Sequence, residues 1–155
     1  MLPIRTAAKR GAIRVLCAAL ATCLVLGARA AHAQPGEYKV VVNADNPMTS
    51  VSRDVVAAMF LKRQTRWPGG AEVTPVDLGS ASPVRAAFSR TVLGKQMAQV
   101  SAYWQQQIFS GRGTPPPEKA GDAAVLSYVA ASPGAIGYVS AGASAPGTKV
   151  VAIRP

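Results

Sequence analysis

The side chains best suited to chemistry in this sequence are small hydroxyl groups before a predicted helix. The stretch 79–82 directly precedes Pro83, and serine followed by proline is a typical helix start. The first N–H groups of a helix have no backbone partner and lie at the positive end of its dipole, so such a turn can hold an anion. We therefore predict that Ser80 and Ser82 bind a small anion. The alternative is that Ser82 only caps its helix.

Arg112 is the third candidate for this site. It stands between Gly111 and Gly113, where a guanidinium group could reach an anion and bind it through two parallel hydrogen bonds. A solvated loop arginine is the alternative. Thr49 and Ser50 form a further donor pair, with the same alternative of a purely local role.

The N-terminal 33 residues have the pattern of a secretory signal peptide. Four basic residues precede an apolar run at 15–28, which is too short to span a bilayer, and Ala31 and Ala33 give a small-x-small site before Gln34. We expect cleavage after Ala33 and a periplasmic mature domain, 34–155, that does not span the membrane. An uncleaved anchor is the alternative.

Loss of this leader changes the chemical inventory of the chain. Both cysteines and the single histidine lie within 1–33, and twelve basic against seven acidic residues remain, a net charge of +5. Triads that need histidine or cysteine, and typical zinc or haem sites, are therefore excluded. The seven acids form no recognisable catalytic motif, so we expect a protein that is not an enzyme and has no cofactor. The basic cluster 62–67 is interpreted as a solvated helix end, not a nucleic-acid site.

Hydrophobic patterning predicts alternating strands and helices. Pro75 indicates that its strand lies at an edge, and the proline-rich stretch 110–117 indicates an irregular loop. This pattern predicts a layered α/β domain, with a mostly parallel or mixed sheet flanked by helices. The predicted strands are 38–43, 73–78, 135–139 and 149–153, and the predicted helices begin at Ser50 or Ser52 and cover 82–94, 96–109 and 122–131.

The junction between the last helix and the next strand is the most informative segment. Pro133 and Gly134 stop the helix, since proline lacks the N–H and glycine tolerates a left-handed cap. Gly137 interrupts the strand that follows, which indicates either a bulge or a close approach of another group to its backbone.

The order of several motifs resembles one protein family. Met59-Phe60-Leu61-Lys62, Trp67, the helix start at Ser82, Tyr103-Trp104, Phe109-Ser110-Gly111 and Pro133 to Tyr138 follow one another as in the phosphate-binding proteins of bacterial ABC transporters, within the type 2 periplasmic binding protein superfamily. Short single-lobe exported relatives are more similar still. The resemblance implies a single-lobe periplasmic-binding-protein-like α/β domain.

Two departures from that family limit what the resemblance implies. Full members clamp their solute between two lobes, whereas 34–155 has room for one. Their phosphate loop has an Arg-Ser-Asp-Gly-Ser-Gly-Thr type sequence, whereas the matching stretch here, 77–83, keeps hydroxyls at Ser80 and Ser82 but lacks the arginine, and Asp77 would repel an anion. The resemblance implies binding of phosphate or another small anion, with an ABC permease as partner. The alternative is an envelope interaction or adapter module that binds no solute.

Overall fold

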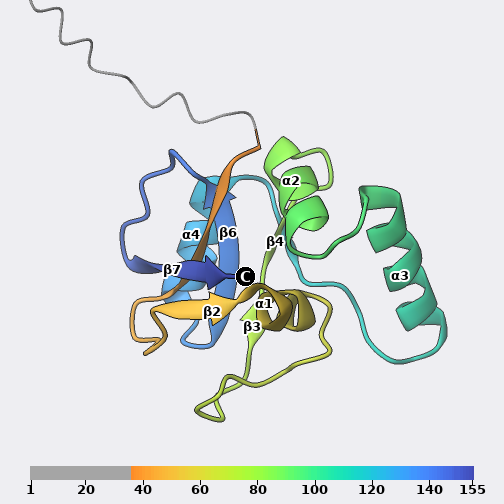
Figure 1. The fold of residues 1–155 in the computed structure, drawn as a ribbon, viewed down its shortest axis with the longest axis horizontal. Coiled ribbons are helices and arrows are strands. Elements are labelled where there is room, and N and C mark those ends of the chain that lie inside the picture. Colours follow the sequence, from red (N-terminus) through yellow and green to blue (C-terminus); the bar gives the residue numbers. More distant parts are fainter. Residues whose placement is uncertain (1–35) are drawn as a thin grey trace, which may run out of the picture. The chain divides into compact units, whose positions relative to one another are not determined.

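A five-stranded mixed sheet organises residues 36–155, the part of the chain that the computed structural model describes (Figure 1). The predicted signal peptide, its cleavage site after Ala33, both cysteines and the histidine lie outside these residues. No helix within 36–155 has the length and apolar character needed to cross a membrane.

The elements alternate along the chain much as the patterning predicts. The strands are β1 (Tyr38–Asn43), β2 (Ser50–Ser52), β3 (Thr74–Pro75), β4 (Asp77–Leu78), β5 (Glu118–Lys119), β6 (Ala135–Ser140) and β7 (Thr148–Arg154). The helices are α1 (Arg53–Phe60), α2 (Pro83–Thr91), α3 (Met97–Phe109) and α4 (Asp122–Ala131).

The large sheet has the order β2-β7-β1-β6-β3. Central β1 runs antiparallel to both neighbours, β6 and β7, while β2 is parallel to β7 and β3 is parallel to β6. Strands β4 and β5 form a separate parallel pair. The sheet is therefore mixed and flanked by helices, which confirms the predicted fold class.

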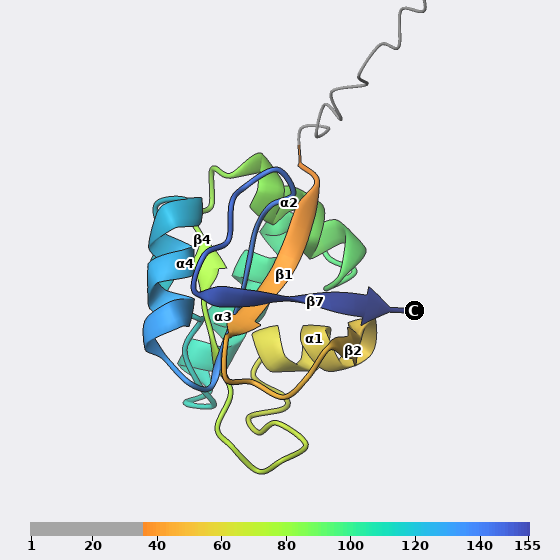
Figure 2. The same cartoon turned by 90° about the vertical axis from the view of Figure 1, so that its left-hand side faces the viewer.

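Helices cover both faces of the sheet. Neighbouring residues of β6 point to opposite faces, so they contact different helices. A Cβ on Gly137 would lie 2.8 Å from Val125 of α4, which shows that α4 packs directly on this backbone, as the sequence predicted. On the other face the Tyr138 ring stacks on Phe88 of α2, with centroids 3.9 Å apart, and contacts Phe60 of α1. Figure 2 shows α4 on one side of β1, and α1 and α2 on the other.

The predicted strand 73–78 is divided in the structure. Thr74 and Pro75 pair with β6 at the edge of the large sheet, as Pro75 indicated, whereas Asp77 and Leu78 pair with β5. Proline has no N–H to donate onward, which suits the last strand of a sheet. The sequence patterning missed β2 and β5, which are only three and two residues long.

Helix α3 is less buried than its apolar stripe predicted. Val100 and Trp104 are buried, but the side chain of Ile108, placed on that stripe, is 51% exposed, and Phe109 is 90% exposed. The Tyr103 hydroxyl donates to the carbonyl of Leu61 at 2.8 Å, which ties the helix to the segment after α1. Figure 1 shows α3 beside the rest of the domain rather than over the sheet, which agrees with the exposure of its last turn.

Candidate functional site

The turn between β4 and α2 holds two of the three predicted site residues. Ser82 is the N-cap of α2: its Oγ accepts a hydrogen bond from the Arg85 N–H at 3.4 Å, and its own N–H donates to Gly79 O at 2.9 Å. Ser82 therefore caps α2, as the alternative interpretation of its sequence position expected. Ser80 is exposed, and within 36–155 nothing accepts a hydrogen bond from the N–H of Ser80, Ala81 or Val84. These donors face the start of a nine-residue helix, where an anion is electrostatically favoured.

Arg112 lies elsewhere. It follows the end of α3, where its N–H donates to Gln107 O at 2.9 Å, and both flanking glycines have positive φ angles. Its side chain is exposed, and no hydrogen bond joins it to Ser80 or Ser82 in the described part of the chain. The structure thus brings the two serines together on one turn but gives no contact between that turn and Arg112.

An ionic cluster beside the turn, in which Arg85 and Asp77 are buried and Glu118 is exposed, escaped the sequence analysis. Arg85 Nη2 lies 3.0 Å from Asp77 Oδ2, and Arg85 Nη1 lies 2.5 Å from Glu118 Oε1 and 2.7 Å from Leu78 O. The Tyr138 hydroxyl donates to Asp77 Oδ1. A signal did exist: Arg85 lies between Val84 and Phe88 on the buried face of α2, where an arginine needs partners.

Both Nη atoms of the Arg85 guanidinium are paired within this cluster. Burial raises the pKa of the Asp77 carboxyl, although the Arg85 guanidinium and the Tyr138 hydroxyl oppose that shift. Burial and the neighbouring Asp77 carboxylate raise the pKa of Tyr138 above its ordinary value. Since one guanidinium faces two carboxylates, Arg85 has no charge left for a ligand at the turn.

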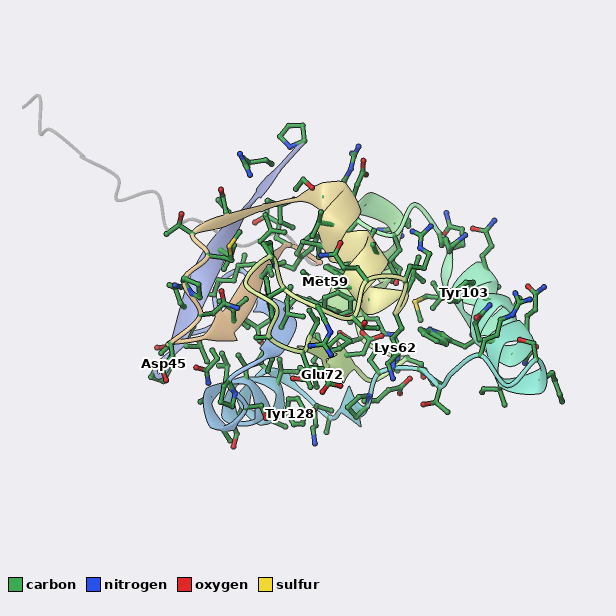
Figure 3. The ribbon with its side chains drawn as sticks, turned by 90° about the horizontal axis from the view of Figure 1, so that it is seen from below. Asp45, Met59, Lys62, Glu72, Tyr103 and Tyr128 are labelled. Carbon is green, nitrogen blue, oxygen red and sulfur yellow. The ribbon has the colours of Figure 1, made fainter. Side chains whose placement is uncertain are left out.

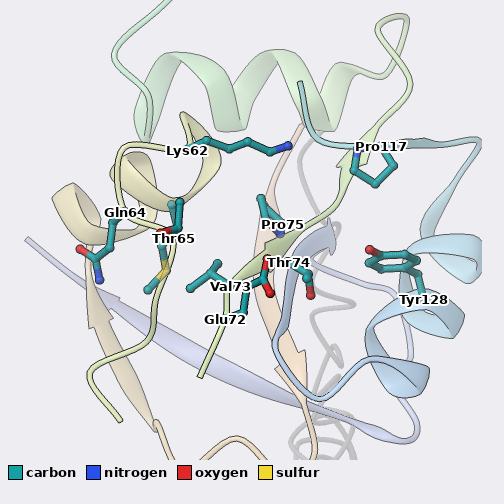
Figure 4. A pocket seen from close by; sticks show the side chains of 10 residues that line it. Lys62, Gln64, Thr65, Glu72, Val73, Thr74, Pro75, Pro117 and Tyr128 are labelled. Atoms are coloured by element: carbon teal, nitrogen blue, oxygen red, sulfur yellow. The ribbon is translucent and has the colours of Figure 1, made fainter. Parts of the chain in front are cut away.

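Two hollows lie away from this turn. The arginine hollow, about 730 Å³, lies between α1 and the end of α2 and carries the guanidinium groups of Arg53, Arg63 and Arg90 together with Asp54. The Lys62 pocket, about 250 Å³, lies below β3 (Figure 4). Its lining residues are Met59, Lys62, Gln64, Thr65, Glu72, Val73, Thr74, Pro75, Pro117 and Tyr128. None of the three predicted site residues lines either hollow.

The described residues offer no cluster for a metal ion. Within 36–155 no three histidine, cysteine, aspartate or glutamate side chains gather in a way that could coordinate one.

Comparisons with known proteins give the same fold. No family model and no curated protein matches the sequence. Among solved structures, a protein described as a phosphate ABC transporter substrate-binding protein from Clostridium perfringens, with bound phosphate, superposes with a TM-score of 0.60 at 19% identity. An ABC-type phosphate transport receptor from Vibrio cholerae and PstS from Borrelia burgdorferi each give 0.59, at 16% and 11% identity.

These matches also show what share of each solved binding protein corresponds to this chain. Each covers 76% of this chain but only 44%, 46% and 47% of the Clostridium, Vibrio and Borrelia chains, so this chain spans less than half the length of the proteins it matches. At identities below one fifth, the agreement concerns the fold and not the ligand. The chain thus has the fold found in the phosphate-type periplasmic binding proteins, over less than half of their length.

Proposed function

We propose that this protein is an exported solute-binding lobe that holds a small anion at the β4–α2 turn, and that phosphate is the first anion to test. The observation that carries the proposal is a set of N–H groups at the start of α2, those of Ser80, Ala81 and Val84, which have no hydrogen-bond partner within 36–155. Unpaired N–H groups at the positive end of a helix bind phosphate and carboxylate groups. The fold shared with phosphate-binding proteins supports the same choice, and an ABC permease is the partner that this function would serve.

The ionic cluster limits the strength of such binding. Asp77 and Glu118 contribute two negative charges against the single positive charge of Arg85, and Asp77 lies two residues before the turn begins at Gly79. A divalent anion at the turn is repelled by this excess charge, whereas its hydrogen bonds come only from backbone groups and exposed hydroxyls. We therefore expect weak binding and a preference for anions of low charge.

Isothermal titration calorimetry of the purified protein with phosphate, sulfate and chloride tests the proposal. A Ser82→Asp variant is the sharpest site probe, because aspartate also caps helices well but places a negative charge where the anion would lie. We expect Ser82→Asp to retain the melting temperature and to lose phosphate affinity by at least about tenfold. Ser80→Ala should weaken binding by a smaller factor without loss of stability.

The arginine hollow provides the control for the location of the anion. If phosphate binds the wild type, a double replacement of Arg63 and Arg90 by glutamine should leave its affinity unchanged. Loss of binding in that double variant, with retention in Ser82→Asp, would place the anion between α1 and α2 instead. The absence of saturable heat with every anion, together with no rise in melting temperature, would rule out anion binding.

The alternative function is an interaction module of the cell envelope. The end of α3 favours it, since Ile108 and Phe109 expose apolar side chains that soluble surfaces seldom place together. Under this alternative a Phe109→Ser variant keeps its stability but loses association with its envelope partner, whereas Ser82→Asp does not. Solute binding predicts the reverse pattern.

A further inference from the structure

The Lys62 pocket combines two opposite charges that are not paired with each other. Lys62 and Glu72 both line it, yet among the described residues neither takes part in a salt bridge, although Arg85, Asp77 and Glu118 do. Figure 3 shows Lys62 and Glu72 on the same side of the molecule, and Figure 4 shows the Lys62 side chain extending across the pocket towards Pro117. A ligand with one anionic and one cationic group would satisfy both.

The backbone at Lys62 is held in a conformation that non-glycine residues rarely adopt. Its φ angle is +53°, and it is the only non-glycine residue within 36–155 with a positive φ. The Lys62 N–H donates to Met59 O at 3.0 Å, and the N–H groups of Arg63 and Gln64 both donate to Ala58 O. The chain thus leaves α1 in a left-handed turn, and its lysine is directed over the pocket. The hydrogen bonds from the Lys62 and Arg63 N–H groups are the Schellman pattern by which helices commonly end, with Lys62 at the position that usually holds glycine.

Two hydroxyl groups in the pocket are also without partners. The Thr74 Oγ1 is buried and makes no hydrogen bond, one of only two such side-chain atoms in the described residues. The Tyr128 hydroxyl also has no hydrogen-bond partner within 36–155, and Figure 4 shows it directed towards the Thr74 side of the pocket. The Thr74 Oγ1 has almost no accessible surface, so its side chain must turn for a ligand to reach it. Because a buried hydroxyl without a partner is unfavourable, a ligand that accepts or donates there gains affinity.

Apart from Gln64 and Thr65, the remaining wall of the pocket is apolar and rigid. Met59, Val73, Pro75 and Pro117 supply aliphatic surface. The segment Glu72–Pro75 is fixed by Gly134, whose carbonyl accepts hydrogen bonds from Thr74 N and from Trp67 Nε1, each at 3.0 Å. A rigid pocket binds with a smaller loss of conformational entropy.

We propose that the Lys62 pocket binds a small zwitterion of α-amino-acid type with an apolar side chain. Lys62 pairs with the carboxylate, Glu72 with the ammonium group, and the hydroxyls of Thr74 and Tyr128 hydrogen-bond to the same polar end. The side chain lies on the apolar wall, and the pocket volume of about 250 Å³ accommodates a molecule of this size. This site is separate from the β4–α2 turn and does not depend on anion binding there.

Calorimetry with leucine and its truncated analogues tests the charge requirement. Leucine carries both charges, 4-methylpentanoate keeps only the carboxylate, and 3-methylbutylamine keeps only the ammonium group. Leucine should bind saturably, and each single-charge analogue should bind at least about tenfold more weakly, because one charged side chain then loses its partner. Phenylalanine extends the test to a larger apolar side chain. Analogues that bind as tightly as leucine would overturn the proposal, and so would the absence of saturable binding of both amino acids at millimolar concentration.

Matched variants then locate the site. Lys62→Met and Glu72→Gln should each lower leucine affinity by about tenfold or more, and Thr74→Val by about fivefold. Lys95→Met, Asp45→Asn and Thr114→Val make the same chemical changes outside the pocket and should bind as wild type. Wild-type affinity in both Lys62→Met and Glu72→Gln would overturn the site.

Thr74→Val separates ligand contact from damage to the fold. It replaces a buried hydroxyl without a partner by a methyl group, so the free protein should keep or raise its melting temperature while leucine affinity falls. A lower melting temperature with unchanged affinity would show that the hydroxyl serves the fold and would overturn its role in binding. Phosphate titration of the same variants should give wild-type values, so failure here is distinguishable from failure at the β4–α2 turn.

Discussion

The Tyr138 hydroxyl donates a hydrogen bond to Asp77 Oδ1 inside the core. Its ring is at the same time stacked on Phe88, with an interplanar angle of 8°. One side chain of β6 therefore connects the large sheet to β4 and to α2. Because Asp77 also pairs with Arg85, the support for the β4–α2 turn depends on this contact.

Replacement of Tyr138 by phenylalanine should change how stability depends on alkaline pH. The pKa of Tyr138 is raised in the folded protein from the ordinary value of 10.0, so the unfolded chain releases this proton first as pH rises. The wild type should then lose about 1.4 kcal/mol of stability per pH unit above 10, from this group alone. Urea unfolding on either side of pH 10 should show that Tyr138→Phe lacks this component, although it is less stable at neutral pH. Parallel pH profiles of the two proteins would contradict the prediction.

Gly134→Ala should be among the most destabilising small substitutions in the domain. A Cβ at this position would lie 2.0 Å from the carbonyl oxygen of Glu72, a backbone atom that cannot move without opening the edge of the sheet. We expect a loss of at least about 3 kcal/mol in the free energy of unfolding. Gly137→Ala should cost about 1–3 kcal/mol, because its neighbours are side chains. Gly69→Ala, with no atom within 4 Å of its Cβ, is the control and should be nearly neutral.

Lys62→Gly should stabilise the free protein although it removes a charged side chain. Glycine adopts the observed φ of +53° without the steric cost that a Cβ imposes, which is about 1–2 kcal/mol. Glycine also raises the conformational entropy of the unfolded chain, which offsets part of this effect. We therefore expect the free energy of unfolding to rise by up to about 1 kcal/mol. Arg63→Gly, at the next residue with an ordinary φ, should instead be neutral or destabilising. Equal effects of both changes in denaturant unfolding would show that the left-handed turn is not strained.

Replacement of Ser82 should reveal its value as a cap. Ser82→Ala removes the acceptor for the Arg85 N–H and should cost about 1 kcal/mol, whereas Ser82→Asp keeps an acceptor and should cost little. Ser80→Ala is the matched control, because Ser80 lies two residues earlier in the same turn and makes no hydrogen bond in the described residues. A loss of stability in Ser80→Ala equal to that in Ser82→Ala would contradict this assignment.

Much of the fold follows from local sequence signals. Ser82 and Pro83 fix the start of α2, the run Tyr38–Asn43 forms the central strand, and Asp122–Ala131 forms a helix with the predicted bounds. These signals work because capping, proline geometry and apolar runs depend on residues close together in the chain. Gly137 belongs to the same class, since a glycine inside an apolar strand indicates the close packing that α4 provides.

Other features of this protein required the tertiary structure. Gly134, expected to tolerate a left-handed cap, has no positive φ and is needed because Glu72 O approaches it from another segment. A two-residue strand such as β5 is too short to show the hydrophobic pattern from which strands are predicted.

The sequence by itself determined a mixed α/β fold and the capped turn at Ser82, since both depend on local patterns. Only the tertiary structure decided that Arg85 is neutralised by Asp77 and Glu118, that Arg112 makes no contact with the turn, and that Lys62 and Glu72 share a pocket. The physical reason is that charge pairing and pocket formation depend on distances between segments that are far apart in the chain.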